Sequence, residues 1–172
     1  PAATPLIVAG ASEVKTLYLQ GSTALTRIQH ATNTSTVIAK NTSNTWTLGS
    51  TIFNDMVLDS TQSLAIPIWI TAVQAKANGA TVTLNCSSCT NNPIASASVN
   101  INNGGPTRYT FSLNFGADVT VNTGSNYSLT ITNNSTSKNL TVDTFIAGEY
   151  SKIDKVTKDV IKKKITYIFI LK

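Results

Sequence analysis

Two cysteines stand three residues apart in the run Asn85-Cys86-Ser87-Ser88-Cys89, and the chain contains no others. One C-x-x-C pair offers two ligands, whereas a structural zinc ion takes four. A thioredoxin-like redox role needs a βαβ setting, which the surrounding pattern does not provide. The spacing therefore favours a small disulfide that closes a loop after a strand, with free thiols as the alternative.

Acid–base catalysis needs paired titratable groups, and the chain offers one histidine and eight carboxylates. No catalytic motif joins them, so His30 is interpreted as a surface or rim residue. A glycosidase-type carboxylate pair stays open as an alternative, because the fold would bring its members together. The candidates are Asp55, Asp59, Asp118, Asp143 and Glu149, of which Asp118 is interpreted as a turn residue near Gly116. We expect no enzymatic activity, no metal and no cofactor.

Asparagine side chains are a third chemically significant group, because N-x-S/T triplets accept N-linked glycans. Seven triplets occur, where chance placement of Asn, Ser and Thr predicts about four. They begin at Asn33, Asn41, Asn85, Asn126, Asn133, Asn134 and Asn139. Several fall in predicted turns, and the adjacent Asn133 and Asn134 are not expected to carry glycans together. The sequence thus predicts covalent N-linked glycans.

The charge distribution is uneven. Residues 1–150 carry six basic and six acidic side chains, whereas residues 151–172 carry seven Lys and two Asp. A nearly uncharged body is poorly soluble unless glycans hydrate it or it assembles. The basic run is short and lacks Arg, so no nucleic-acid partner is expected. The sequence contains no stretch of about 18 apolar residues, so no membrane-spanning helix is predicted.

The elements that must position these residues are β-strands. Thr, which favours strands, and Ser and Asn, which favour turns, together supply 61 of the 172 residues. Apolar or alternating runs recur between turn signals at intervals of about ten to twelve residues. The predicted strands cover residues 5–10, 14–20, 46–58 (as a pair around Gly49-Ser50), 63–75, 80–86, 97–102, 108–115, 119–121, 127–131, 140–142 and 165–171.

Some segments carry more specific predictions. Pro67, inside the apolar run 63–75, predicts a bend or a sheet edge in a long strand. Asn78-Gly79 predicts a tight turn. Residues 31–45 predict a loop or an edge strand, and residues 152–164 predict a helical turn or an edge strand.

Together these patterns predict an all-β fold, an antiparallel β-sandwich of jelly-roll or immunoglobulin-like type. Residues 1–12 are predicted as a separate segment hinged at Gly10-Ala11-Ser12, and residues 13–172 as one sandwich domain including the basic C-terminal strand. The segment's apolar run would be a donor strand that adds to the next subunit, and such head-to-tail contacts build fibres. That run is Pro5, Leu6, Ile7, Val8, Ala9 and Gly10, with residues 165–171 as the alternative donor.

The layout resembles a known family. With a short apolar N-terminal segment in place of a long apolar helix, a β-sandwich body and many glycosylation triplets, the chain resembles archaeal thread-type pilins. The body from Trp46 to Val142, with its run from Gly124 to Asn133, also resembles jelly-roll domains of secreted microbial proteins. The first resemblance implies a glycosylated subunit of an extracellular cell-surface pilus. Identical subunits would join by donor-strand complementation, with a role in adhesion or biofilm formation.

Two other classes of protein stay open. A viral capsid or appendage jelly roll shares the fold and the low charge, and would assemble into closed shells. A secreted carbohydrate-binding module would be a monomer that stacks sugars on aromatic side chains. For that role Trp46, in a polar segment, is predicted to be exposed, whereas Trp69 is assigned to the core.

Overall fold

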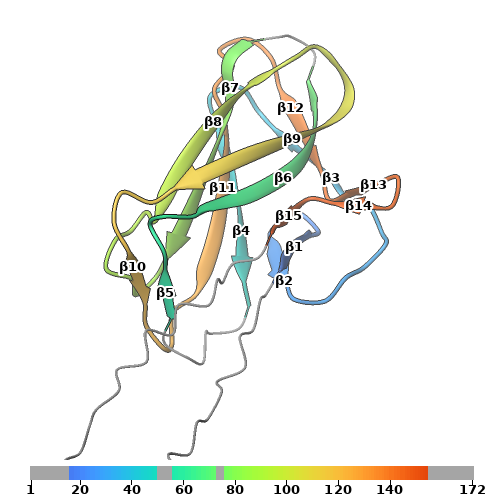
Figure 1. The fold of residues 1–172 in the computed structure, drawn as a ribbon. Coiled ribbons are helices and arrows are strands. Elements are labelled where there is room, and N and C mark those ends of the chain that lie inside the picture. The colour runs from blue at the N-terminus through green and yellow to red at the C-terminus, as the bar shows by residue number, and fades with distance from the viewer. Residues whose placement is uncertain (1–15, 50–55, 73–75, 155–172) are drawn as a thin grey trace, which may run out of the picture.

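The computed structural model describes residues 16–49, 56–72 and 76–154, and every regular element in them is a β-strand (Figure 1). The predicted all-β fold class is therefore confirmed. Within the same residues, the structure contains no helix that is long and apolar enough to cross a lipid bilayer. The described strands are β1 (Leu17–Gln20), β2 (Ala24–Thr26), β3 (Ser35–Ile38), β4 (Ser43–Leu48), β5 (Met56–Leu58), β6 (Ser63–Ala72), β7 (Lys76–Cys86), β8 (Ala95–Ile101), β9 (Gly104–Asn114), β10 (Val119–Val121), β11 (Tyr127–Asn133), β12 (Leu140–Asp143), β13 (Phe145–Ile146), β14 (Glu149–Tyr150) and β15 (Lys152–Ile153).

Two main sheets form a sandwich (Figure 1). One has seven strands in the order β15-β1-β2-β4-β11-β7-β8, and the other has four in the order β3-β12-β6-β9. Short ladders pair β5 with β10 and β13 with β14. Neighbouring strands run antiparallel, as predicted, except that β2 and β4 are parallel. Hydrophobic residues of both sheets meet in one core cluster between them.

The core follows from the two-residue period of strands, in which alternate side chains point to opposite faces. In β11, Tyr127, Leu129 and Ile131 are buried while Ser128 and Thr130 are only partly buried. In β6, the buried side chains inside the sandwich are Leu64, Ile66, Ile68, Ile70 and Ala72. Thr is therefore abundant because it fills the outward positions of strands whose inward positions are apolar.

Two local predictions were wrong. Asn78-Gly79 is not a turn but lies inside β7, where the pairing with β8 shifts register between Lys76 and Ala80. A bulge of this kind accommodates a glycine within a strand. The predicted strand pair at residues 46–58 does not form either. Its first strand, β4, pairs with β11 and β2, whereas β5 pairs with β10.

Pro67 lies in a part of β6 that has no β12 residue paired with it on one side. β12 pairs with β6 only from Trp69 to Ala72. On that side, the Trp69 backbone N–H donates to the Ser151 hydroxyl and Ala65 accepts from the Asp154 N–H. Backbone groups alternate sides along a strand, so the Pro67 nitrogen faces the interval between these two contacts. The proline removes no ladder hydrogen bond there, which agrees with the predicted sheet edge.

Candidate functional site

Cys86 and Cys89 form a disulfide at the end of β7, with their Cα atoms 5.6 Å apart. The enclosed loop is attached to β10, because Cys89 forms a bridge with Val121. The Ser88 carbonyl also accepts a hydrogen bond of 2.9 Å from the Asn122 side chain. The cysteine pair thus fixes one loop to the end of the sandwich, and we assign it a structural role.

Replacing both cysteines by alanine is expected to lower the free energy of unfolding by about 2 kcal/mol, because the entropic gain from a cross-link is small for a short loop. The cysteines are only three residues apart. Urea unfolding of C86A/C89A beside the oxidised wild type measures the loss, and thiol-reduced wild type should shift similarly. An unchanged midpoint in both samples would contradict the structural role.

Asn133 is a structural residue of the core rim. It is 1% exposed. Its Nδ2 donates to the carbonyl oxygens of Ile38 at 3.0 Å and Lys138 at 2.9 Å, and its Oδ1 accepts from the Ser135 N–H at 2.9 Å. Both amide hydrogens are used, so a glycan on Nδ2 would break one of these bonds and would find no space. The structure therefore argues against a glycan at this triplet.

The other six triplet asparagines differ in exposure and in the use of Nδ2. Asn41 and Asn139 are exposed, whereas Asn85, Asn126 and Asn134 are half-buried. Asn33 is exposed, but its Nδ2 donates to the buried Asp143 at 2.9 Å. Nδ2 of Asn85 and Asn134 donates to threonine hydroxyls, at 3.4 and 2.8 Å respectively.

The two tryptophans lie opposite to their predicted positions. Trp46 in β4 is 0% exposed, and its Nε1 donates to the Gly21 carbonyl at 3.1 Å. Trp69 in β6 is half-buried, and its Nε1 donates to the Glu149 carbonyl at 3.2 Å. Thr45 and Thr47, the neighbours of Trp46 in the sequence, point to the outer face of β4, whereas Trp46 points inward. The two-residue period, rather than the polarity of the neighbours, was the signal that would have placed Trp46 inside.

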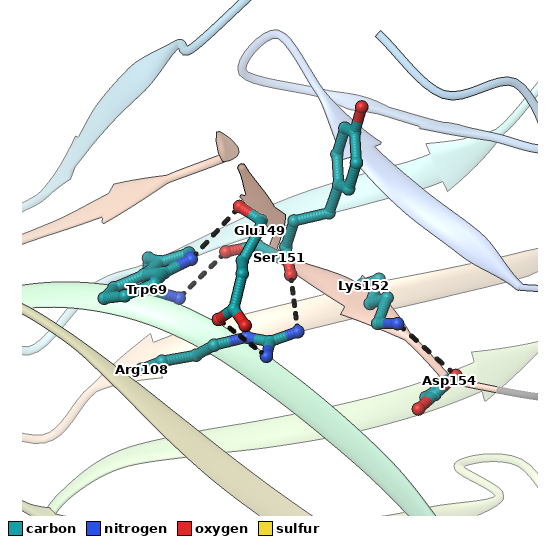
Figure 2. A network of polar contacts seen from close by, with 7 residues as sticks. Trp69, Arg108, Glu149, Ser151, Lys152 and Asp154 are labelled. Carbon is teal, nitrogen blue, oxygen red and sulfur yellow. Dashed lines mark hydrogen bonds and ion pairs between the residues drawn. The ribbon is translucent and has the colours of Figure 1, made fainter. Parts of the chain in front are cut away.

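Figure 2 shows a polar network that fastens the end of the described chain to the outer face of β6 and β9. The Arg108 guanidinium pairs with Glu149 at 2.9 Å and donates to the Tyr150 carbonyl at 3.2 Å. The Ser151 hydroxyl accepts the Trp69 backbone N–H at 2.8 Å. The Arg108 and Glu149 side chains are 26% and 54% exposed, so their ion pair contributes little stability. The network positions β14 beside Trp69 and leaves part of the indole accessible.

The outer face of β4, β11, β7 and β8 forms an uncharged hydroxyl face. Its registered positions are Ser43, Thr45, Thr47, Ser128, Thr130, Thr132, Thr81, Thr83, Asn85, Ser96 and Ser98. Cross-strand hydrogen bonds join Thr45 to Thr130 at 2.9 Å and Thr83 to Ser96 at 3.0 Å. Pairs of this kind each contribute about 0.2–1 kcal/mol to a sheet. The face contains no acid–base group, and we assign it to sheet stability and hydration.

One side of the sandwich is less well covered. β8 and β9 are the last strands of the two sheets, and no described strand pairs with their outer edges. Four hydrophobic residues of these strands are only partly buried against the core, and we call them the β8–β9 seam: Ala95, Ala97, Val99 and Tyr109. The Tyr109 hydroxyl accepts the Asn102 N–H at 2.9 Å, which fixes the ring near the β8–β9 turn. The seam combines an open strand edge with exposed apolar surface.

The described chain begins and ends at the other edge of the seven-stranded sheet. β1 pairs with β15, with Leu17 opposite Ile153. The described chain therefore begins and ends on neighbouring strands, whereas β8 is the strand farthest from β15 in the sheet order. The predicted donor strand, residues 5–10, and the alternative at 165–171 lie outside the described residues.

The described carboxylates have structural partners. Asp118 accepts from the Ser60 N–H and hydroxyl, as suits a turn residue, and Asp59 accepts from Thr61. Asp143 is buried and accepts from Asn33 and Ser35, and Glu149 pairs with Arg108. Asp55 lies outside the described residues. His30 is half-buried, with its ring centre 6.5 Å from that of Tyr150.

Among the described residues, no three His, Cys, Asp or Glu side chains group to hold a metal ion. Burial raises the pKa of Tyr127 far above its ordinary value, so this hydroxyl stays protonated and is not a base.

Comparison with known proteins finds no protein family that matches the chain and no match among curated proteins. Solved structures of a CocE/NonD family hydrolase from Staphylococcus aureus are similar in fold. One has a TM-score of 0.59 at 10% identity, with 85% of this chain and 37% of the hydrolase chain covered. Another has a TM-score of 0.57 at 9% identity, covering 91% and 39%. The chain thus spans well under half the length of these hydrolases, and at such identity the likeness concerns the fold alone.

Proposed function

We propose that this protein is a non-catalytic structural subunit of an extracellular cell-surface filament, and that a terminal strand of one subunit adds to the next sandwich. The supporting observation is the placement of two features on one sheet. The described chain begins at β1 and ends at β15, and β8, which carries three of the four seam residues, lies at the opposite edge of the same sheet.

This arrangement favours open-ended assembly. A contact between one edge of a subunit and the opposite edge of its neighbour uses two different surfaces, so it is heterologous. Such a contact leaves one free surface at each end of the growing chain and adds subunits head to tail. A contact between identical edges would instead close into a dimer.

The seam has the chemistry of a strand acceptor. An added strand beside β8 would satisfy the backbone groups of its open edge, and its inward side chains would cover the small Ala97 and the adjacent Val99. The run at residues 5–10 carries Leu6 and Val8 at alternate positions, which suits this role. Residues 165–171 are the alternative donor. Glycans on a body that carries no net charge would keep the filament hydrated outside the cell.

Electron microscopy of the native material, before any denaturant, tests the proposal. We expect long fibres one subunit wide with regularly repeating knobs. Closed shells would support the capsid alternative, and monodisperse particles of about the 18.2 kDa of the chain plus glycans would refute assembly.

Carbohydrate binding is the second candidate, favoured by one patch. The half-buried Trp69 lies beside the Arg108–Glu149 pair on the outer face of β6 and β9. An aromatic ring next to planar polar groups suits a sugar, whose apolar face stacks while its hydroxyls hydrogen-bond. The patch replaces the predicted site at Trp46, which is buried.

A further inference from the structure

We infer that Asn41 and Asn139 are the N-glycan acceptors of this protein, and that they form one glycan-bearing end of the sandwich. Both begin N-x-S/T triplets. They are the two triplet asparagines that are exposed and whose Nδ2 donates no hydrogen bond to a described residue. The inference concerns modification and does not depend on polymerisation.

Attachment at Asn139 would preserve its existing contact. A glycan bonds to Nδ2 and leaves the side-chain carbonyl free to accept hydrogen bonds. The Asn139 Oδ1 accepts the Lys40 backbone N–H at 3.2 Å. Because that contact uses only Oδ1, it can persist after modification while Nδ2 carries the sugar.

Asn41 projects from the turn between β3 and β4. Its φ of 54° places it in the left-handed region, which Asn tolerates better than most residues. Its backbone N–H donates to the Ser135 carbonyl at 2.9 Å, and the Thr42 hydroxyl donates to the Ala39 carbonyl at 2.9 Å. These bonds fix the turn through the backbone and Thr42, so the Asn41 side chain is left available.

The two acceptors are neighbours in space. The Lys40 N–H that binds Asn139 belongs to the residue immediately before Asn41. Two glycans would therefore leave the same end of the sandwich. Asn133 lies at this end as well, but both hydrogens of its amide are committed, so we infer that it stays unmodified beside the two acceptors.

Peptide mass spectrometry of the full chain, secreted from yeast that adds high-mannose glycans, tests the assignment. Enzymatic glycan release in heavy-oxygen water marks each formerly modified asparagine. We expect occupancy at Asn41 and Asn139 to exceed that at Asn133 by about tenfold or more, since modifying Asn133 sacrifices a buried hydrogen bond. The wild-type chain alone gives this result, so no variant needs to fold.

Substitution adds a second measurement. Asn41→Gln and Asn139→Gln should each remove one glycan, and the double variant should migrate as unmodified protein. Occupancy at Asn133 that equals that at Asn41 and Asn139, absence of sugar from both Asn41 and Asn139, or glycans persisting in the double variant at wild-type level would each overturn the inference. None of these outcomes bears on whether the protein forms filaments, which electron microscopy tests separately.

Discussion

Deletion of residues 1–10 is expected to give a folded protein that no longer polymerises. The described sheet does not need them for pairing, because β1 already pairs with β2 on one side and β15 on the other. Loss of two buried apolar side chains of the donor would remove about 3–6 kcal/mol from each contact, or roughly two to four orders of magnitude in association. Sedimentation and electron microscopy measure polymer, and circular dichroism checks the fold.

A pair of point variants isolates the acceptor. Ala97→Asp introduces a charge into the β8–β9 seam, where an added strand would have to cover it, and polymer should be lost. Ser98→Asp places the same charge on the outer face of the same strand, where Ser98 is exposed, and polymer should persist. Normal polymers from the deletion would identify residues 165–171 as the donor. Normal polymers from Ala97→Asp would instead refute the seam as the acceptor.

Trp46→Ala is expected to lower the free energy of unfolding by about 3–5 kcal/mol, a large part of the stability of a domain this size. The indole is fully buried, and its loss also removes the donor to the Gly21 carbonyl. Trp69→Ala should cost much less, because that ring is only half-buried. Urea unfolding of both variants gives the comparison, with Trp46→Phe as a milder core change. Equal losses of unfolding free energy in Trp46→Ala and Trp69→Ala would contradict the assignment of Trp46 to the core and Trp69 to the surface.

Trp69→Ala also tests the second candidate function. If the Trp69 patch binds sugars, wild-type protein should be retained on insoluble cellulose or chitin, and the variant should lose retention while keeping its fold. Retention that is absent in the wild type on both supports, or unchanged in the variant, would count against a sugar-binding role for this patch.

The fold class was predictable from sequence because side chains alternate throughout strands such as β11, with Ser or Thr at each outward position. Strand pairing was less predictable, since it depends on partners far apart in the chain. The sequence around Gly49 looked like a hairpin, yet β4 joins β11 and β5 joins β10. β2 and β13 to β15 are only two or three residues long and leave no periodic signal.

The candidate sites were predictable in part. The cysteine spacing and the seven triplets are visible in the sequence, but the hydrogen bonds that each asparagine side chain makes are not. Asn133 and Asn134 are indistinguishable by motif, and only the carbonyls of Ile38 and Lys138 reveal that Asn133 is committed. The seam depends on which strands end the two sheets, and the local sequence of β8 does not carry that information.

The hydroxyl face does not determine the register in which neighbouring strands pair. Its rows are chemically repetitive, so a slip of two residues between β4 and β11 would again place hydroxyl opposite hydroxyl. That face cannot distinguish the correct alignment from the shifted one. The distinction must come from the inner face, where Leu129 lies between Trp46 and Leu84 and shapes differ from row to row. Ser and Thr on the outer face can therefore replace each other without changing the strand register, which the inner face sets.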